Sequence, residues 1–194
     1  MDKKIKIISK RTRTYRAIHK WIALPALVFM FIIGSTGLLL GWKKQTTLLP
    51  PTQKGITAQT SAWLSLDKLT DIAQNYVSDS LHLDETIDRM DVRPDKGIVK
   101  MRFVDHFQEV QLDLQTGKIL SVSTRGSDII EKIHDGSILD YFIGTPGDEI
   151  KLIYTTLSAS SLILLSFSGF WLWYNPKRIR KKKHESEKVE LTSL

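Results

Sequence analysis

The sequence contains no cysteine among its 194 residues. Disulfide bonds, thiolate zinc sites and iron–sulfur ligation are therefore excluded. Covalent attachment of a c-type haem is excluded as well, because it requires the motif C-x-x-C-H. Any folded domain in this chain must be held together by its own hydrophobic core.

Charged residues are missing from two long segments. Residues 21–42 hold no charged side chain over 22 positions, and residues 152–174 hold none over 23. At about 1.5 Å per residue, either run makes a helix of roughly 33 Å, enough to cross a hydrocarbon core of about 30 Å. We therefore predict two transmembrane helices, at residues 21–42 and 150–174. The first lacks an A-x-A-like cleavage site, which favours a retained anchor over a signal peptide.

The formal net charge of +7 is unevenly distributed. Residues 1–20 contain eight Lys or Arg and one acid, and residues 175–194 contain seven and three, whereas the remainder carries a net charge of −4. Basic segments beside a membrane helix stay in the cytoplasm. Both ends are thus predicted to be cytoplasmic, with residues 43–151 on the other side. The basic ends suit anionic membrane lipids, which argues against nucleic-acid binding.

The central region has the pattern of a small α+β domain. Apolar residues recur with helical spacing from Leu66 to Tyr76, and Ser65 is a suitable N-cap. Strands are predicted at residues 86–92, 97–104, 107–114 and 118–123, with hairpin-sized turns between them. We expect one helix packed on an antiparallel meander of about four strands.

The third predicted strand alternates between apolar and polar residues. Its apolar side chains would face the helix, and Glu109, Gln111 and Asp113 would lie on the other face. A further helix is predicted over Ser127–Phe142, near the outer membrane surface. The expected segments are a basic cytoplasmic arm (1–20), a transmembrane helix (21–42), a linker (43–64), the α+β domain (65–125), a juxtamembrane helix and loop (126–149), a transmembrane helix (150–174) and a basic cytoplasmic tail (175–194).

Small residues that permit close helix packing occur in both membrane segments. They are Gly34, Gly37, Gly41, Ser158, Ala159 and Gly169. The spacing of Gly37 and Gly41 is of the small-xxx-small type. It suits contact between the two helices of one chain and contact in a homodimer equally.

Five segments occur in a characteristic order. They are Arg16–Ile22, Ser35–Leu38, Glu109–Leu120, His134–Gly136 and Ser168–Trp173. Together they resemble the PepSY-associated transmembrane-helix family in a minimal two-span form, with Ser168 in place of the family's Thr. The resemblance implies a PepSY-like domain on the periplasmic side of the bacterial inner (cytoplasmic) membrane. Larger relatives with four spans include siderophore-iron reductases that hold haem with membrane histidines, and PepSY domains in propeptides are thought to inhibit peptidases.

Among five histidines, His19 and His134 are the candidates for haem that this resemblance implies. They are predicted at opposite ends of the membrane spans, roughly 30 Å apart. One chain therefore cannot place both on the same haem, although an oligomer could bring together two copies of either. His82, His106 and His184 are expected to be ordinary surface residues.

No catalytic constellation is recognisable. The sequence has no G-x-S-x-G and no H-E-x-x-H motif. Asp105 and Asp113 have His106 between them in sequence, but turn and strand roles explain them better than a catalytic pair. We expect no catalytic residue and no metal site.

The sequence favours a non-catalytic binding or modulatory component of an envelope process. Its expected partners are membrane lipids and a protein partner or second copy that contacts the membrane helices. Two alternatives follow from the resemblance: a haem-associated redox component of iron or siderophore uptake, and an inhibitor of envelope peptidases.

Overall fold

The computed structural model describes residues 3–145 and 147–192. The chain divides into two compact units. We call Met1–Ser35 together with Ile133–Leu194 the helical unit, and Thr36–Lys132 the sheet unit.

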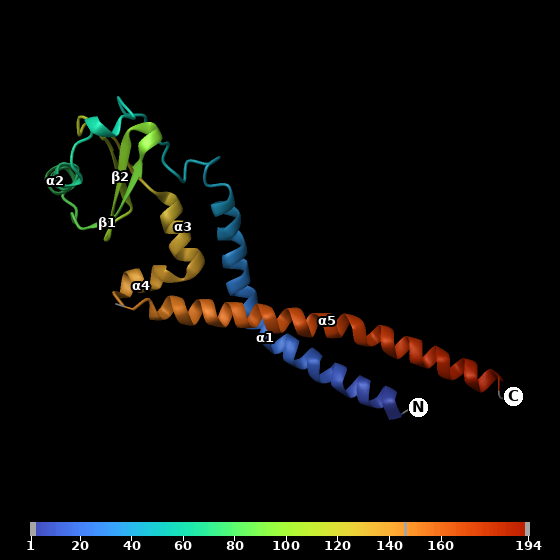
Figure 1. The fold of residues 1–194 in the computed structure, drawn as a ribbon. Helices are drawn as coiled ribbons and strands as arrows, with labels where there is room; N and C mark the ends of the chain where they lie inside the picture. Colours follow the sequence, from blue (N-terminus) through green and yellow to red (C-terminus); the bar gives the residue numbers. More distant parts are fainter. Residues whose placement is uncertain (1–2, 146, 193–194) are drawn as a thin grey trace. The chain divides into compact units, whose positions relative to one another are not determined.

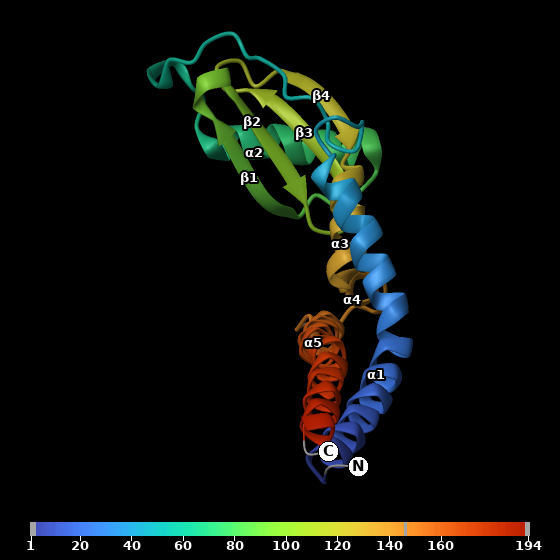
Figure 2. The ribbon, with the colours of Figure 1, turned by 90° about the vertical axis from the view of Figure 1, so that its right-hand side faces the viewer.

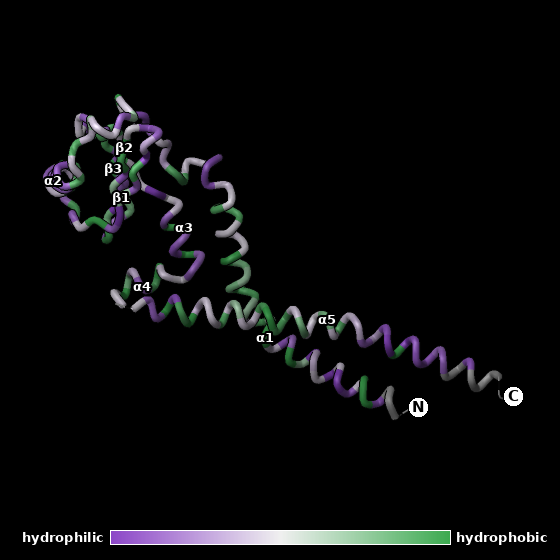
Figure 3. Tube along the Cα trace, viewed as in Figure 1, coloured by the Kyte–Doolittle hydropathy of each residue, from purple (hydrophilic) through white to green (hydrophobic). Residues whose placement is uncertain are grey.

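Two long helices dominate the helical unit: α1 (Lys3–Gly41), whose last residues belong to the sheet unit, and α5 (Glu149–Thr192). Each contains a segment long and apolar enough to cross a membrane, Lys6–Gly41 and Glu149–Glu185. Only 11% and 6% of their most apolar windows are buried within the chain, whereas the core helix of a soluble protein would be mostly buried. Figure 3 shows the apolar stretches and the polar C-terminal part of α5. The two predicted membrane helices are confirmed.

The helix of the sheet unit begins where the sequence predicts. Helix α2 (Leu66–Tyr76) is capped by Ser65, whose Oγ accepts a hydrogen bond of 3.3 Å from the backbone N–H of Lys68. A π-helical turn, Val77–Leu81, continues it and ends at His82, which has a φ of 54°. This left-handed residue stops the helix and redirects the chain toward the first strand.

Four strands form one antiparallel meander in sequence order: β1 (Ile87–Arg93), β2 (Ile98–Phe103), β3 (Gln108–Asp113) and β4 (Ile119–Thr124). The predicted strands and their order are confirmed. A short 3-10 turn, Pro94–Lys96, joins β1 to β2 and ends at Gly97, which has a φ of 63°. A Cβ at Gly97 would come within 2.1 Å of the Thr57 carbonyl oxygen, so only glycine fits there.

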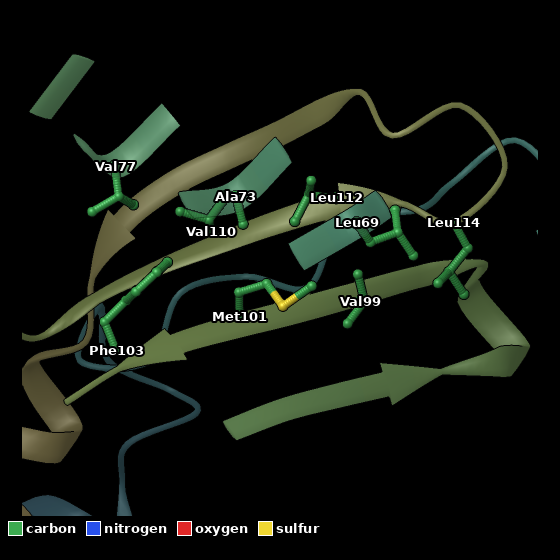
Figure 4. Packing of buried hydrophobic residues seen from close by; sticks show 9 residues of the cluster. All are labelled: Leu69, Ala73, Val77, Val99, Met101, Phe103, Val110, Leu112 and Leu114. Carbon is green, nitrogen blue, oxygen red and sulfur yellow. The ribbon is translucent and has the colours of Figure 1, made fainter. Parts of the chain in front are cut away.

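Helix α2 covers one face of the sheet and buries the hydrophobic core (Figures 1, 2 and 4). The buried cluster consists of Leu69, Ala73, Val77, Val99, Met101, Phe103, Val110, Leu112 and Leu114. The apolar face of β3 therefore packs as predicted. Leu66, the first member of the predicted helical stripe, is 51% exposed, because the buried stripe starts one turn later at Leu69 and extends to Val77.

On the second face of the sheet the central strands β2 and β3 are also buried, and the residues that cover them were expected to form only a linker. Residues 48–56 cross this face, and apart from the 3-10 turn Thr60–Ala62 the linker has no helix or strand. The backbone N–H of Gln53 donates to Gln111 Oε1 at 2.9 Å, and Gln111 Nε2 donates to the Pro51 carbonyl at 3.0 Å. Hydrogen bonds to its backbone thus attach the linker to β3.

The segment predicted as one helix over Ser127–Phe142 is two helices, α3 (Gly126–Asp135) and α4 (Ser137–Ile143). Gly136 separates them with a φ of 83°. A Cβ at this position would lie 2.7 Å from ring carbons of Tyr154 on α5. The break therefore lets the chain turn tightly against α5, which the apolar periodicity did not reveal.

The core predicts a sharp contrast between two leucines of α2. Leu69→Ala removes a side chain with no exposed surface and should lower the free energy of unfolding by about 2–5 kcal/mol. Leu66→Ala, on the exposed face, should change it by about 0.5 kcal/mol or less. Urea-dependent proteolysis of the sheet unit in the full-length, detergent-solubilised protein measures both. Equal losses would contradict the observed placement of the core.

Candidate functional sites

His19 lies where α1 packs against α5. Its Nδ1 is 2.8 Å from Ser168 Oγ, and the Ser168 hydroxyl donates to the Leu164 carbonyl at 2.6 Å. Because a hydroxyl has one hydrogen, His19 Nδ1–H is the donor in the first contact. Tyr15 stacks on Trp171 in the same region, with ring centroids 6.3 Å apart. His19 thus joins two helices through Ser168.

His134 lines a cavity in the helical unit, which we call the helix cavity. The cavity has a volume of about 250 Å³. Its lining comes from α1, α3 and α5 and consists of Met30, Ile33, His134, Asp135, Tyr154, Thr155, Ser158, Ala159 and Leu162. Sequence reasoning singled out His134, Ser158 and Ala159 for two different reasons, and the structure brings them together here.

Asp135 is a charged group at the wall of the helix cavity. Burial disfavours its carboxylate, but hydrogen bonds from Ser137 and the ion pair with Lys151 outweigh that effect, and the pKa of Asp135 lies below its ordinary value. Lys151 Nζ lies 3.2 Å from its Oδ2. Asp135 is therefore a paired anion rather than an acid or base at ordinary pH.

The two histidines do not fit a shared haem within one chain. His19 contacts Ser168, whereas His134 shares its cavity with Tyr154. Tyr154 and Ser168 are fourteen residues apart on one helix, roughly 21 Å at the usual rise. Two axial nitrogens must each lie on the order of 2 Å from the iron, so the distance excludes a common ligand.

The predicted small-residue stripe is only partly used within the chain. Among the described residues, a Cβ at Gly34 or Gly41 would meet no atom within 4 Å, whereas one at Gly169 would contact His19 Cε1 at 3.7 Å. Gly37 is half-buried. Helix contact in a second copy of the chain remains a prediction for Gly34 and Gly41.

The second face of the sheet unit contains a network of buried charges that sequence reasoning missed. Glu109 is fully buried, and its Oε1 lies 3.2 Å from Lys100 Nζ and accepts from Gln111 Nε2 at 2.8 Å. Its Oε2 pairs with Arg125, which also donates through Nε to Asp128 at 2.9 Å. Burial by itself would lower the pKa of Arg125, but Asp128 and Glu109 raise it above its ordinary value.

Asp113 fixes both the linker and the β3–β4 turn. Its Oδ2 accepts from the backbone N–H of Ile56 at 2.6 Å, and its Oδ1 accepts from the N–H groups of Gln115 and Thr116 at 3.0 and 2.7 Å. Burial works against the charge, but these donors hold the pKa of Asp113 below its ordinary value. Asp113 ends β3, whereas His106 precedes its start, so the structure separates the two.

His106 positions a turn. Its Nδ1 accepts from the Gln108 backbone N–H at 3.2 Å, so its Nε2–H donates to the Asp84 carbonyl at 2.9 Å. The ring also stacks on Phe103, with centroids 4.9 Å apart. Both ring nitrogens therefore have structural partners.

A cavity of about 510 Å³ lies beside the buried network, and we call it the basic cavity. Its lining consists of Lys43, Lys44, Leu49, Pro50, Pro51, Thr52, Asp91, Arg93, Lys96, Lys100 and Arg125. Arg93 pairs with Asp91 at 2.7 Å, and Lys100 and Arg125 pair with Glu109. Among the described residues no carboxylate lies within 4.0 Å of Lys44 or Lys96.

The basic cavity therefore has an excess of positive charge. Six cationic side chains line it, against Asp91 in the lining and Glu109 and Asp128 behind it. Because the buried pairs fix Lys100 and Arg125, part of the cationic wall is rigid. Such a wall binds carboxylates or phosphates with little loss of side-chain entropy.

Substitution of Asp113 should change the pH dependence of the free energy of unfolding, because its carboxylate stabilises the sheet unit only when charged. Asp113→Asn should destabilise the sheet unit by about 1–3 kcal/mol at pH 7, because its amide NH₂ cannot accept from the backbone donors. A carboxyl group whose pKa is lower in the folded chain stabilises the fold at pH values above its pKa in the unfolded chain. This stabilisation is lost as the pH falls through its pKa in the folded chain. The difference from the wild type should therefore be full above about pH 5 and shrink below about pH 4.

Urea-dependent proteolysis at several pH values measures this difference in the full chain. Asp79→Asn, at an exposed position of the π-helical turn, is the control and should leave stability and its pH dependence unchanged. A pH-independent loss in Asp113→Asn would show that the carboxylate charge contributes nothing.

Any haem that His19 or His134 holds with a second histidine of the same kind must lie between two chains. If protein expressed with excess haem precursor contains haem, absorbance and light scattering across a size-exclusion column should therefore show the Soret band only in dimeric fractions. His19→Ala or His134→Ala should remove the band and the haem-dependent dimer together. A haem-containing monomer that keeps its spectrum in both variants would contradict this expectation.

Comparison with known proteins gives one match. The sequence model of the family described as PepSY-associated TM region matches residues 16–191, which is nearly the whole chain. No significant match was found among curated proteins or among solved structures.

Proposed function

Since the chain belongs to the PepSY-associated transmembrane family, we propose that it is a non-catalytic binding protein of the bacterial inner membrane that recognises an acidic segment of an envelope protein. Two membrane helices anchor it, and a PepSY domain supplies the recognition surface. The basic cavity of the sheet unit is the single observation that carries this proposal.

The charge of the flanking segments supports the orientation. Eight basic residues precede the first charge-free run and seven follow the second. Because such segments resist export, the N- and C-termini face the cytoplasm and the PepSY domain faces the periplasm. The acidic partner is therefore a periplasmic protein or the periplasmic part of a membrane protein.

The composition of the basic cavity favours an extended peptide over a single small anion. Its volume of about 510 Å³ falls in the range of ordinary ligand pockets, about 300–1,000 Å³. Lys44 and Lys96, which pair with no carboxylate among the described residues, supply cations, and Leu49, Pro50 and Pro51 supply apolar lining. A peptide offers both carboxylates for the lysines and aliphatic carbons for the prolines.

The two alternatives from the sequence stay predictions. A redox role requires haem, which within one chain His19 and His134 cannot share. Inhibition of a peptidase would use the same PepSY domain, and a peptidase with an acidic surface segment is one partner that the basic cavity could accept.

Binding of an acidic probe tests the proposal. The full chain in phosphatidylcholine nanodiscs should bind fluorescent hexaglutamate, and the affinity should fall as salt is raised. The double variant Lys44→Glu, Lys96→Glu should bind about tenfold more weakly or worse, because it reverses two charges in the cavity. The control Lys68→Glu, Lys118→Glu makes the same change in net charge at two exposed positions outside the cavity and should bind as the wild type does.

Two results would overturn the proposal. Equal weakening in both double variants would show that the probe senses only net charge. The second result is loss of hexaglutamate binding when phosphatidylglycerol replaces phosphatidylcholine in the nanodisc, in the wild type and the control variant alike. That result would assign the basic cavity to a lipid headgroup instead.

A further inference from the structure

Two hydroxyl groups in the helix cavity have no hydrogen-bond partner in the part of the chain that the structure describes. They are Tyr154 Oη and Ser158 Oγ, and both atoms are buried. Ser158 is only 5% exposed. Buried hydroxyls are nearly always hydrogen-bonded in folded proteins, so an unpaired one calls for an explanation.

Two other serines of the same helix make the backbone hydrogen bond that Ser158 lacks. Ser166 Oγ donates to the Leu162 carbonyl at 2.8 Å, and Ser168 Oγ donates to the Leu164 carbonyl at 2.6 Å. These are the usual bonds of a membrane-helix serine to its own backbone one turn earlier. Ser158 makes no such bond, although the residues around it are equally helical.

Both hydroxyls belong to one prearranged wall. Tyr154 and Ser158 are four residues apart on α5 and therefore lie on the same helix face. Phe29 holds the Tyr154 ring edge-on at a centroid distance of 5.5 Å, and Gly136 lies against the same ring. The tyrosine is thus fixed by its neighbours.

The remaining lining decides which chemistry fits. Asp135 is already paired with Lys151 and carries the only formal negative charge in the lining, so a free anion is disfavoured. No group of three or more His, Asp or Glu side chains that could hold a metal ion occurs among the described residues. Met30, Ile33, Ala159 and Leu162 form the apolar part of the lining, and His134 and Thr155 add two further polar side chains. The cavity therefore suits a neutral ligand with hydrogen-bond acceptors on an apolar body.

We propose that the helix cavity binds the carbonyl-bearing head of a lipid-soluble molecule, with Tyr154 Oη and Ser158 Oγ as the hydrogen-bond donors. Two sources offer this chemistry within a membrane: the ring carbonyls of a quinone and the acyl-ester carbonyls of a phospholipid. The site is in the helical unit and does not depend on the basic cavity or on a protein partner.

Quinone binding is tested first, in nanodiscs of ether-linked phosphatidylcholine, which has no ester carbonyls. The full chain should bind tritiated ubiquinone-1 saturably, with one site per chain. Tyr154→Phe and Ser158→Ala should each weaken binding about tenfold, because each removes one donor and little volume. Ser166→Ala is the matched control, since Ser166 is exposed and bonds to its own helix, and it should bind as the wild type does.

Binding of a phospholipid through its acyl-ester carbonyl is tested in parallel by native mass spectrometry of the detergent-solubilised full chain. If a phospholipid ester occupies the site, the wild type retains one diacyl phosphatidylglycerol, the dialkyl analogue is not retained, and Tyr154→Phe and Ser158→Ala lose the lipid. Ala159→Leu, which keeps both hydroxyls and fills space in the cavity, should abolish binding of whichever ligand the wild type takes.

The proposal is overturned if neither ubiquinone-1 nor the diacyl lipid distinguishes the wild type from Tyr154→Phe and Ser158→Ala. That result, with the variants folded as judged by circular dichroism, would mean that the hydroxyls are satisfied by water alone. Unaltered binding in Ala159→Leu would overturn it as well, because the ligand would then lie elsewhere.

Discussion

A carboxylate without exposed surface, that of Glu109, constrains the arrangement of the sheet unit. An ion removed from water is tolerated only if other charges and hydrogen bonds replace the water. Lys100, Gln111 and Arg125 do so from β2, from β3 and from the segment after β4. The linker then covers what these side chains leave open. One buried charge thus links β2, β3 and the segment after β4 through ion pairs and hydrogen bonds.

This arrangement gives the two faces of the sheet different roles. The face toward α2 is apolar and closes the core. The other face is ionic, and its outer cations line the basic cavity. Removal of one partner from a buried pair is costly because the other charge stays behind. Lys100 and Arg125, which line the cavity, are therefore also structural, whereas the proposed recognition uses Lys44 and Lys96.

The sequence was sufficient for the parts of the fold that depend on side-chain periodicity. The absence of charge predicts the two membrane helices. Apolar spacing predicts α2 and the four strands, and the residue type of Ser65 predicts the cap. The linker was not predictable, because it docks through the carbonyl of Pro51 and the N–H groups of Gln53 and Ile56, and these backbone groups do not distinguish one residue type from another, apart from the N–H that proline lacks. The break at Gly136 lies within an apolar pattern that continues on both sides. Ser158 and Ser166 look alike in sequence, and only the structure shows which hydroxyl lacks a partner.

The docked linker has a consequence for where the PepSY domain starts as an independent folding unit. Leu48 already takes part, since its carbonyl accepts a hydrogen bond of 2.8 Å from the Ser127 N–H. A fragment cut at residue 65 would keep the buried cluster but lose Trp63 and Leu64, which pack against it. It would also expose Lys100 and Glu109 to water and take the Ile56 donor away from Asp113. The smallest fragment with both faces of the sheet complete runs from about Leu48 to Asp128. Its first residue comes seven positions after Gly41, the last residue of α1.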